Sequence, residues 1–131
     1  MTVIDVEERT GVWFDMDGGG RVQIRTLTAD DMKSIRKQTV KKRTEFKKVD
    51  GTPGRFEYEE VNDELQNELF WDRVIVDWSG LYDGKGSEIP CTKENKLLLM
   101  MRSIKFAKFV GECLKELSDS EAELEELASK N

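Results

Sequence analysis

The densest apolar cluster of the chain most strongly constrains how it can fold. Seven large apolar side chains fall within ten residues, at Leu69–Trp71, Val74–Val76 and Trp78. In the whole sequence of 131 residues, by contrast, 37% of the residues are charged, as many as are hydrophobic. A segment that is apolar on nearly every side has no polar face to turn toward water. We therefore expect this segment to be the most buried element of the fold.

The residues before this cluster predict a helix that runs into it. Val61, Leu65 and Leu69 recur every four residues, which is the spacing of one helix face. The sequence therefore predicts a helix over about residues 59–78. The alternation just before it, in Arg55–Glu59, is also compatible with a short strand near Phe56.

The first part of the chain predicts a β-hairpin. Val12–Phe14 and the alternating Val22–Arg25 flank a loop, Asp15–Gly20, whose glycines can adopt the positive φ angles of a tight reversal. Residues 1–27 are therefore assigned to this hairpin.

A polar helix is expected next, over residues 29–48. Thr28 can cap its free N–H groups, and two aspartates follow at the positive end of the helix dipole. We expect the helix to end at Asp50–Gly54, because proline and glycine cannot continue it. Its narrow apolar stripe consists of Met32, Ile35, Thr39 and Phe46.

A third helix is predicted after the loop that ends at Cys91. Thr92 can cap it, and its apolar positions from Leu97 to Leu114 form one broad face. Ser118 and Glu121 have the spacing of a capping box and can begin a short acidic helix, which we expect to fray.

These elements together predict a helix-dominated α+β fold. An N-terminal β-hairpin packs on about three helices in a helical body (28–117), which is followed by an acidic helix or tail (118–131). The length indicates a single domain. The expected core consists largely of Trp13, Phe14, Leu65, Leu69, Trp71, Ile75, Trp78, Leu98, Met101, Ile104 and Leu114.

The absence of histidine excludes many catalytic mechanisms, because no Ser-His or Cys-His pair and no imidazole metal ligand can form. Cys91 and Cys113 form no CxxC motif, and we expect free thiols in a reducing cytoplasm. Asp15-x-Asp17 begins like a calcium loop, but Thr26 replaces its final glutamate, so turn chemistry explains it better. We expect no catalytic residue, cofactor or metal, and a protein that is not an enzyme.

No membrane contact is expected. The N-terminal residues 1–8 lack the basic and apolar regions of a secretory signal. The longest apolar run, Leu97–Met101, has five residues, whereas a bilayer span needs roughly 20. We expect the protein in the cytoplasm.

The net charge of −6 hides an uneven distribution, because residues 33–48 are strongly basic and residues 116–126 strongly acidic. The basic stretch is either a phosphate-binding helix or a solvated face that the acidic tail or a partner balances. The second interpretation is favoured, because the chain is acidic overall and we expect no aromatic residues interleaved for base stacking. Nucleic-acid binding is kept as the alternative function, with a patch of Arg36, Lys37, Lys41, Lys42, Arg43 and Lys47.

The helix after Thr92 has an apolar face that is wide for so small a chain. It is either core or a groove for a partner, and methionines adapt to more than one partner surface. Both interpretations stay open. The candidate partner-binding residues are Trp78, Leu81, Leu97, Met100, Met101, Phe106 and Phe109.

The most informative stretch is a helix-loop-helix corner with residues in a particular order. A tryptophan is followed within two residues by glycine, then an Asp-Gly turn, a proline, and a threonine-capped Glu-Asn helix start before a leucine-rich helix. This order resembles that of the tail assembly chaperones of long-tailed bacteriophages and prophages. The residues that carry it are Trp78, Gly80, Leu81, Asp83, Gly84, Pro90, Thr92, Glu94, Asn95 and Leu98.

The resemblance covers about residues 70–115, and it implies a non-catalytic binding protein. Members of that family bind the long, helical, hydrophobic tape measure protein and keep it soluble while the tail tube forms around it. The tape measure protein is therefore the implied partner, and the tail tube protein and a second copy of the chain are further candidates. The resemblance also implies absence from the finished virion.

Overall fold

The structure is a computed structural model that describes Thr2 and residues 10–129. Apart from Thr2, the N-terminal residues 1–8 used for the secretory-signal prediction lie outside the described residues, as do the last two residues of the acidic end. The chain divides into two compact units, one formed by Met1–Thr26 and Trp71–Asn131, the other by Leu27–Phe70. Four helices and five strands among the described residues confirm an α+β fold that begins with strands.

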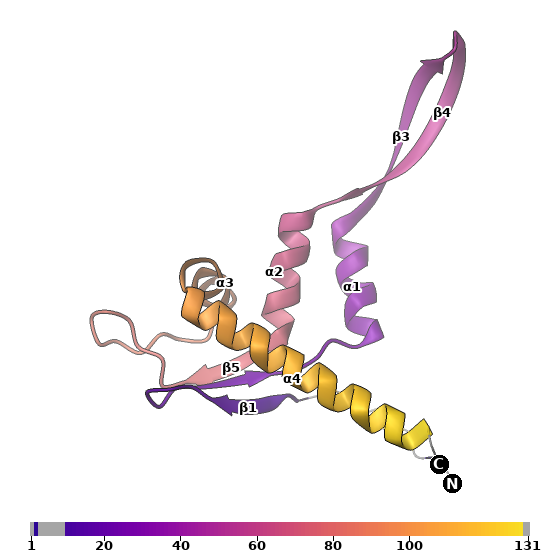
Figure 1. Ribbon diagram of the computed structural model, residues 1–131. Helices are drawn as coiled ribbons and strands as arrows, with labels where there is room; N and C mark the ends of the chain where they lie inside the picture. The colour runs from indigo at the N-terminus through magenta and orange to yellow at the C-terminus, as the bar shows by residue number, and fades with distance from the viewer. Residues whose placement is uncertain (1, 3–9, 130–131) are drawn as a thin grey trace. The chain divides into compact units, whose positions relative to one another are not determined.

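The first unit contains a three-stranded antiparallel sheet in the order β1-β2-β5 (Figure 1). The predicted hairpin forms β1 (Val12–Asp15) and β2 (Arg21–Ile24). The other side of β2 pairs with β5 (Ile75–Ser79). Val22 and Ile24 alternate onto one face of β2. A register shift at Gln23/Ile24 pairs them with Trp78 and Ile75, so the buried residues of both strands share this face. Helix α4 (Ile104–Ser129) contributes to the same core, which contains Val22, Ile24, Val74, Ile75, Trp78, Phe106, Val110 and Cys113.

The helix predicted over residues 59–78 is wrong at both ends. Residues up to Val61 belong to a strand, α2 spans only Asp63–Val74, and β5 follows at once. β-branched residues at 74–76 favour a strand, and β2 supplies its partner from a distant part of the sequence. The expectation of deep burial is confirmed for Val74, Ile75 and Trp78, whereas Val76 is exposed.

The second unit holds the other large difference from prediction. Helix α1 (Ala29–Thr39) begins at the predicted Thr28 cap but ends nine residues earlier than expected. Residues 40–48 belong instead to β3 (Val40–Val49), which pairs with β4 (Thr52–Val61) along its whole length. The predicted stop is a hairpin turn, with positive φ at Asp50 (54°) and Gly51 (79°). Two-residue hairpin turns require this geometry and favour Asp-Gly. We call this β3–β4 hairpin, Val40–Val61, the ribbon.

The third predicted helix is two helices, because the chain breaks at Ser103. Helix α3 (Lys93–Arg102) begins at the predicted Thr92 cap, whose hydroxyl accepts a hydrogen bond from the Asn95 N–H (3.2 Å). The Ser103 hydroxyl accepts from the Phe106 N–H (3.1 Å) and so caps α4. Helix α4 then continues through Ser118, so no separate acidic helix begins there.

Four expected core residues are exposed, namely Trp13, Leu98, Met101 and Ile104. Trp13 lies on the edge strand β1 opposite Gln23, on the face away from the core, where the Arg21 guanidinium stacks over its ring at 5.1 Å. The break at Ser103 interrupts the apolar stripe, so Met101 and Ile104 turn outward, with 84% and 87% of their surface exposed. The other expected core residues are buried or half-buried.

Candidate partner-binding site

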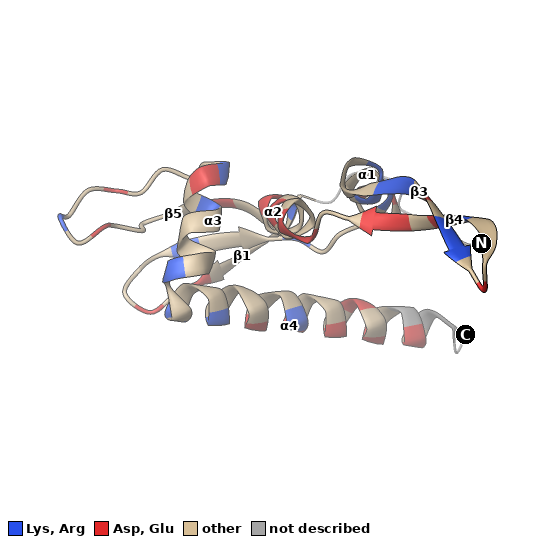
Figure 2. Cartoon of the chain, turned by 90° about the horizontal axis from the view of Figure 1, so that it is seen from above, with Lys and Arg blue, Asp and Glu red and all other residues tan. Residues whose placement is uncertain are grey.

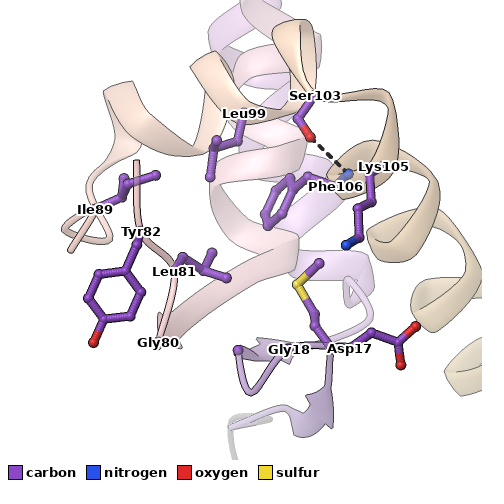
Figure 3. Close-up of a pocket in the computed structure, with 12 residues that line it drawn as sticks. Asp17, Gly18, Gly80, Leu81, Tyr82, Ile89, Leu99, Ser103, Lys105 and Phe106 are labelled. Atoms are coloured by element: carbon purple, nitrogen blue, oxygen red, sulfur yellow. Dashed lines mark hydrogen bonds between the residues drawn. The ribbon is translucent and has the colours of Figure 1, made fainter. Parts of the chain in front are cut away.

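The first unit has a hollow of about 200 Å³ at one end of its sheet (Figure 3). Three segments form its wall: the β1–β2 turn, the loop after β5, and the junction of α3 and α4. The side chains are mainly apolar, with Lys105, Ser103 and Asp17 as the polar groups. The lining residues are Met16, Asp17, Gly18, Gly20, Gly80, Leu81, Tyr82, Ile89, Leu99, Ser103, Lys105 and Phe106.

Trp78 fixes the loop that forms one wall of this hollow. Its side chain is only 5% exposed, and its ring packs edge-on against Phe106 with 5.7 Å between centroids. The indole N–H donates a hydrogen bond to the Ile89 carbonyl at 2.7 Å. Ile89 in turn donates its backbone N–H to the Leu81 carbonyl (2.7 Å), which closes the loop. The tryptophan therefore joins the sheet, the loop and α4.

Two glycines allow the loop to approach the β1–β2 turn. Gly80 has a positive φ of 73°, and a Cβ there would lie 3.0 Å from the Gly19 carbonyl oxygen. A Cβ on Gly20 would lie 2.7 Å from a Leu81 methyl carbon. Gly80 is thus a left-handed residue directly after strand β5.

Gly80→Ala is expected to lower the free energy of unfolding by about 1–3 kcal/mol, because alanine is strained at this φ and meets backbone atoms. Gly84→Ala is the matched control, since a Cβ there meets no atom within 4 Å. Urea unfolding followed by circular dichroism measures both. Equal stability of the two variants would show that the close approach of Gly80 to the β1–β2 turn does not contribute to the free energy of unfolding.

Short hydrogen bonds order the rest of the loop. The Asp83 carboxylate accepts from the backbone N–H groups of Lys85 (2.8 Å) and Ser87 (3.0 Å). The Asn95 amide donates to the Pro90 carbonyl at 2.9 Å. Most of the motif residues between Trp78 and Leu98 thus build the loop that forms one wall of the hollow. Leu81, Leu99 and Phe106 lie together around this hollow.

Lys96 secures the start of α3 and was not singled out from the sequence. Its side chain is buried, and its Nζ donates to the Asp72 carbonyl oxygen (3.0 Å) and to the Asp72 carboxylate (3.2 Å). A buried lysine needs such partners, because an unpaired buried charge is costly. No local sequence signal links Lys96 to Asp72, since α2 and α3 are separated by a strand and a loop.

The predicted partner-binding residues differ in burial and position. Trp78 and Phe106 are core residues, and Leu81 with Phe106 lines the hollow. Met101 is the most exposed member, at 84%. Leu97, Met100 and Phe109 are half-buried, and Phe109 lines a neighbouring hollow with Lys105 and Lys108. The hollow also contains Met16, Asp17, Tyr82 and Ser103, which sequence reasoning did not select.

The predicted basic patch is distributed over two elements. Arg36 and Lys37 lie on α1, whereas Lys41, Lys42, Arg43 and Lys47 lie on β3, so the single basic helix was wrong. Arg36 pairs with Glu59 at 2.6 Å and Arg43 with Glu60 at 2.6 Å. Lys47 lies 3.5 Å from Glu45. The acidic strand β4 therefore offsets much of this charge. β4 also places Tyr58 directly opposite Arg43. The prediction that no aromatic residues are interleaved with the basic ones was therefore wrong, because it treated these residues as a helix.

Both cysteines of the chain are free thiols, as expected. Burial, together with the nearby Glu116 and Glu112 carboxylates, raises the pKa of the Cys113 thiol to about 11. Burial also raises the pKa of Cys91. Both thiols are therefore poor nucleophiles near neutral pH. Among the described residues, no cluster of three or more metal-binding side chains occurs, and no helix is long and apolar enough to span a bilayer.

The Cys113 shift predicts a loss of stability at alkaline pH. The folded thiol binds its proton more tightly than the unfolded one, so its contribution is complete below pH 9 and is lost as the pH rises toward 11. We expect Cys113→Val to show a smaller decrease in unfolding free energy than wild type between pH 8 and pH 11. Identical decreases in the two proteins would show that titration of Cys113 does not cause the loss of stability.

Comparison with protein families shows that the chain is a prophage protein. The model of the YdaY prophage protein family matches residues 25–131, so the chain belongs to this family. No curated protein and no solved structure gives a significant match. The bacteriophage or prophage origin expected from the sequence is therefore confirmed, and the role in tail assembly stays a prediction.

Proposed function

We propose that this protein is a non-catalytic tail assembly chaperone that acts in the cytoplasm of the host. It binds the tape measure protein and keeps it soluble while the tail tube forms. Membership of a prophage family and the ordered residues from Trp78 to Leu98 support this proposal.

The observation that carries the proposal is the exposed apolar corner between α3 and α4. We use this name for Leu98, Met101 and Ile104, which are 39%, 84% and 87% exposed. Ser103, at the break between these helices, lines the hollow together with Leu99 and Phe106. An amphipathic partner helix binds through apolar anchors that enter such a hollow. Exposed apolar side chains that gather at one place typically mark a binding surface.

Nucleic-acid binding has weaker support. Three of the six patch residues lie next to carboxylates of the same unit, and the chain carries a net charge of −6. Phosphate binding depends on cations that are available to replace counterions.

Co-expression with the tape measure protein of the same prophage tests the proposal. We expect most of the tape measure protein to move from the insoluble to the soluble fraction when this chain is present. A matched expression of the tape measure protein alone is the baseline. An unchanged soluble fraction would contradict the proposed function.

A further inference from the structure

The ribbon carries large apolar side chains that are exposed to solvent. Phe46 is 78% exposed, Val49 50% and Tyr58 49%. Among the residues of both strands, only Val40 and Gly54 are even half-buried. A two-stranded hairpin is marginally stable by itself in water. A binding partner that covers the ribbon would therefore stabilise it.

The tip of the ribbon, residues 46–56, combines a hollow with positive charge. Phe46 lies opposite Arg55 and Lys48 opposite Pro53, so these four residues share one face. A hollow of about 480 Å³ lies here, lined by Phe46, Lys47, Lys48, Pro53, Gly54 and Arg55. Three cations stand against one acidic residue, Asp50, in this segment. The tip therefore suits an apolar side chain that has carboxylates beside it.

The second half of α4 has the complementary chemistry. In the first half of α4, the apolar stripe is buried at Phe106, Val110 and Cys113. The same stripe continues into the second half as far as Leu124, which is 66% exposed. Figure 2 shows that acidic residues dominate this end of the helix. From Glu116 to Ser129 there is no basic residue, and the acidic ones are Glu116, Asp119, Glu121, Glu123, Glu125 and Glu126.

We infer that the ribbon tip of one copy binds the acidic end of α4 of a second copy. Leu124 enters the hollow against Phe46 and Pro53, and the acidic side chains of the helix end, which include Asp119 and Glu123, attract the cations of the tip. This contact joins unlike surfaces, because two ribbon tips or two acidic ends would repel each other. Heterologous contacts of this kind build rings or open chains unless two of them close on each other. The ribbon tip and the acidic helix end consist of other residues than the apolar corner, so this inference does not depend on the proposed function.

Sedimentation velocity of the full chain at rising concentration tests the inference. We expect wild type to exceed the monomer mass of 15.1 kDa, and to return to it in high salt. Lys47→Glu with Lys48→Glu, and separately Asp119→Lys with Glu123→Lys, should each raise the dissociation constant about tenfold or more. Lys47 and Lys48 lie opposite Gly54 and Pro53, so their reversal creates no repulsion across the ribbon.

An equimolar mixture of the two reversed variants is the decisive sample. Each variant repels its own copies, but the acidic ribbon of the first matches the basic helix end of the second. We therefore expect the mixture to associate while each variant alone stays monomeric. Lys33→Glu with Lys37→Glu on α1 is the control with the same net charge as the ribbon variant, and it should associate like wild type. Circular dichroism verifies folding of every variant.

Three results would overturn the inference: a monomeric wild type at all concentrations, a mixture that does not associate, or a control as weak as the ribbon variant. If the wild type stays monomeric but binds a duplex DNA probe, and Lys47→Glu with Lys48→Glu abolishes this binding, the ribbon tip is a nucleic-acid site instead.

Discussion

Trp78→Ala is expected to lower the free energy of unfolding by about 3–5 kcal/mol. The side chain is 5% exposed, packs edge-on against Phe106 and lies opposite Val22 in the sheet. Its removal leaves a cavity between the sheet and α4 and an unsatisfied Ile89 carbonyl. Urea unfolding monitored by circular dichroism measures the loss.

Trp78→Phe is the matched control for this variant. Phenylalanine retains much of the contact with Phe106 but cannot donate to the Ile89 carbonyl, so we expect a loss of about 1–3 kcal/mol. A Trp78→Ala protein as stable as wild type would rule out the role of this residue as the anchor of the loop.

Met101→Asp combined with Ile104→Asp is expected to abolish binding of the tape measure protein, with a dissociation constant raised roughly a hundredfold or more. Both side chains are more than four-fifths exposed, so carboxylates there cost the free chain little. In a complex the same carboxylates would be buried against an apolar partner. Binding is measured by calorimetry, and unfolding of the same samples shows whether stability is unchanged.

Leu124→Asp is the control for the corner variant. Leu124 is also an exposed apolar residue of α4, at 66%, but it lies outside the apolar corner. We expect it to bind the tape measure protein like wild type. Equal loss of binding in both variants would indicate that the effect is not specific to the corner.

Capping signals predicted helix starts well, because they are local. Thr28 and Thr92 both cap helices through the hydrogen bonds that their positions imply. The first hairpin was also predicted correctly, because the glycines of its Asp15–Gly20 loop favour a tight reversal. In each case the physical cause lies within a few residues of the signal.

The ribbon was not predicted, because residues 40–48 were assigned to a helix although a hairpin-turn signal follows them. Asp50-Gly51 between Val49 and Thr52 is a strong hairpin signal, and the β-branched residues that flank it favour strands. The basic residues of β3 also face acidic ones of β4, as in Lys41 opposite Glu60, and this pairing is visible only once the register is known. The partner of β5 was likewise beyond local reasoning, because β2 precedes it by a long stretch of sequence.

The site was partly predictable for a related reason. The apolar run before Ser103 suggested a binding surface, and Met101 is indeed accessible. The hollow next to it was not foreseen, because its wall combines the β1–β2 turn with the loop after β5. Those segments approach each other only through the sheet, at the two glycines Gly20 and Gly80.

Affinity purification of this chain, co-expressed with the tape measure protein of its own prophage, tests the proposed chaperone function. We predict that the tape measure protein co-purifies with wild type and with Leu124→Asp, and that it is lost with Met101→Asp combined with Ile104→Asp. Purification of the wild-type chain without any tape measure protein would contradict the proposed function.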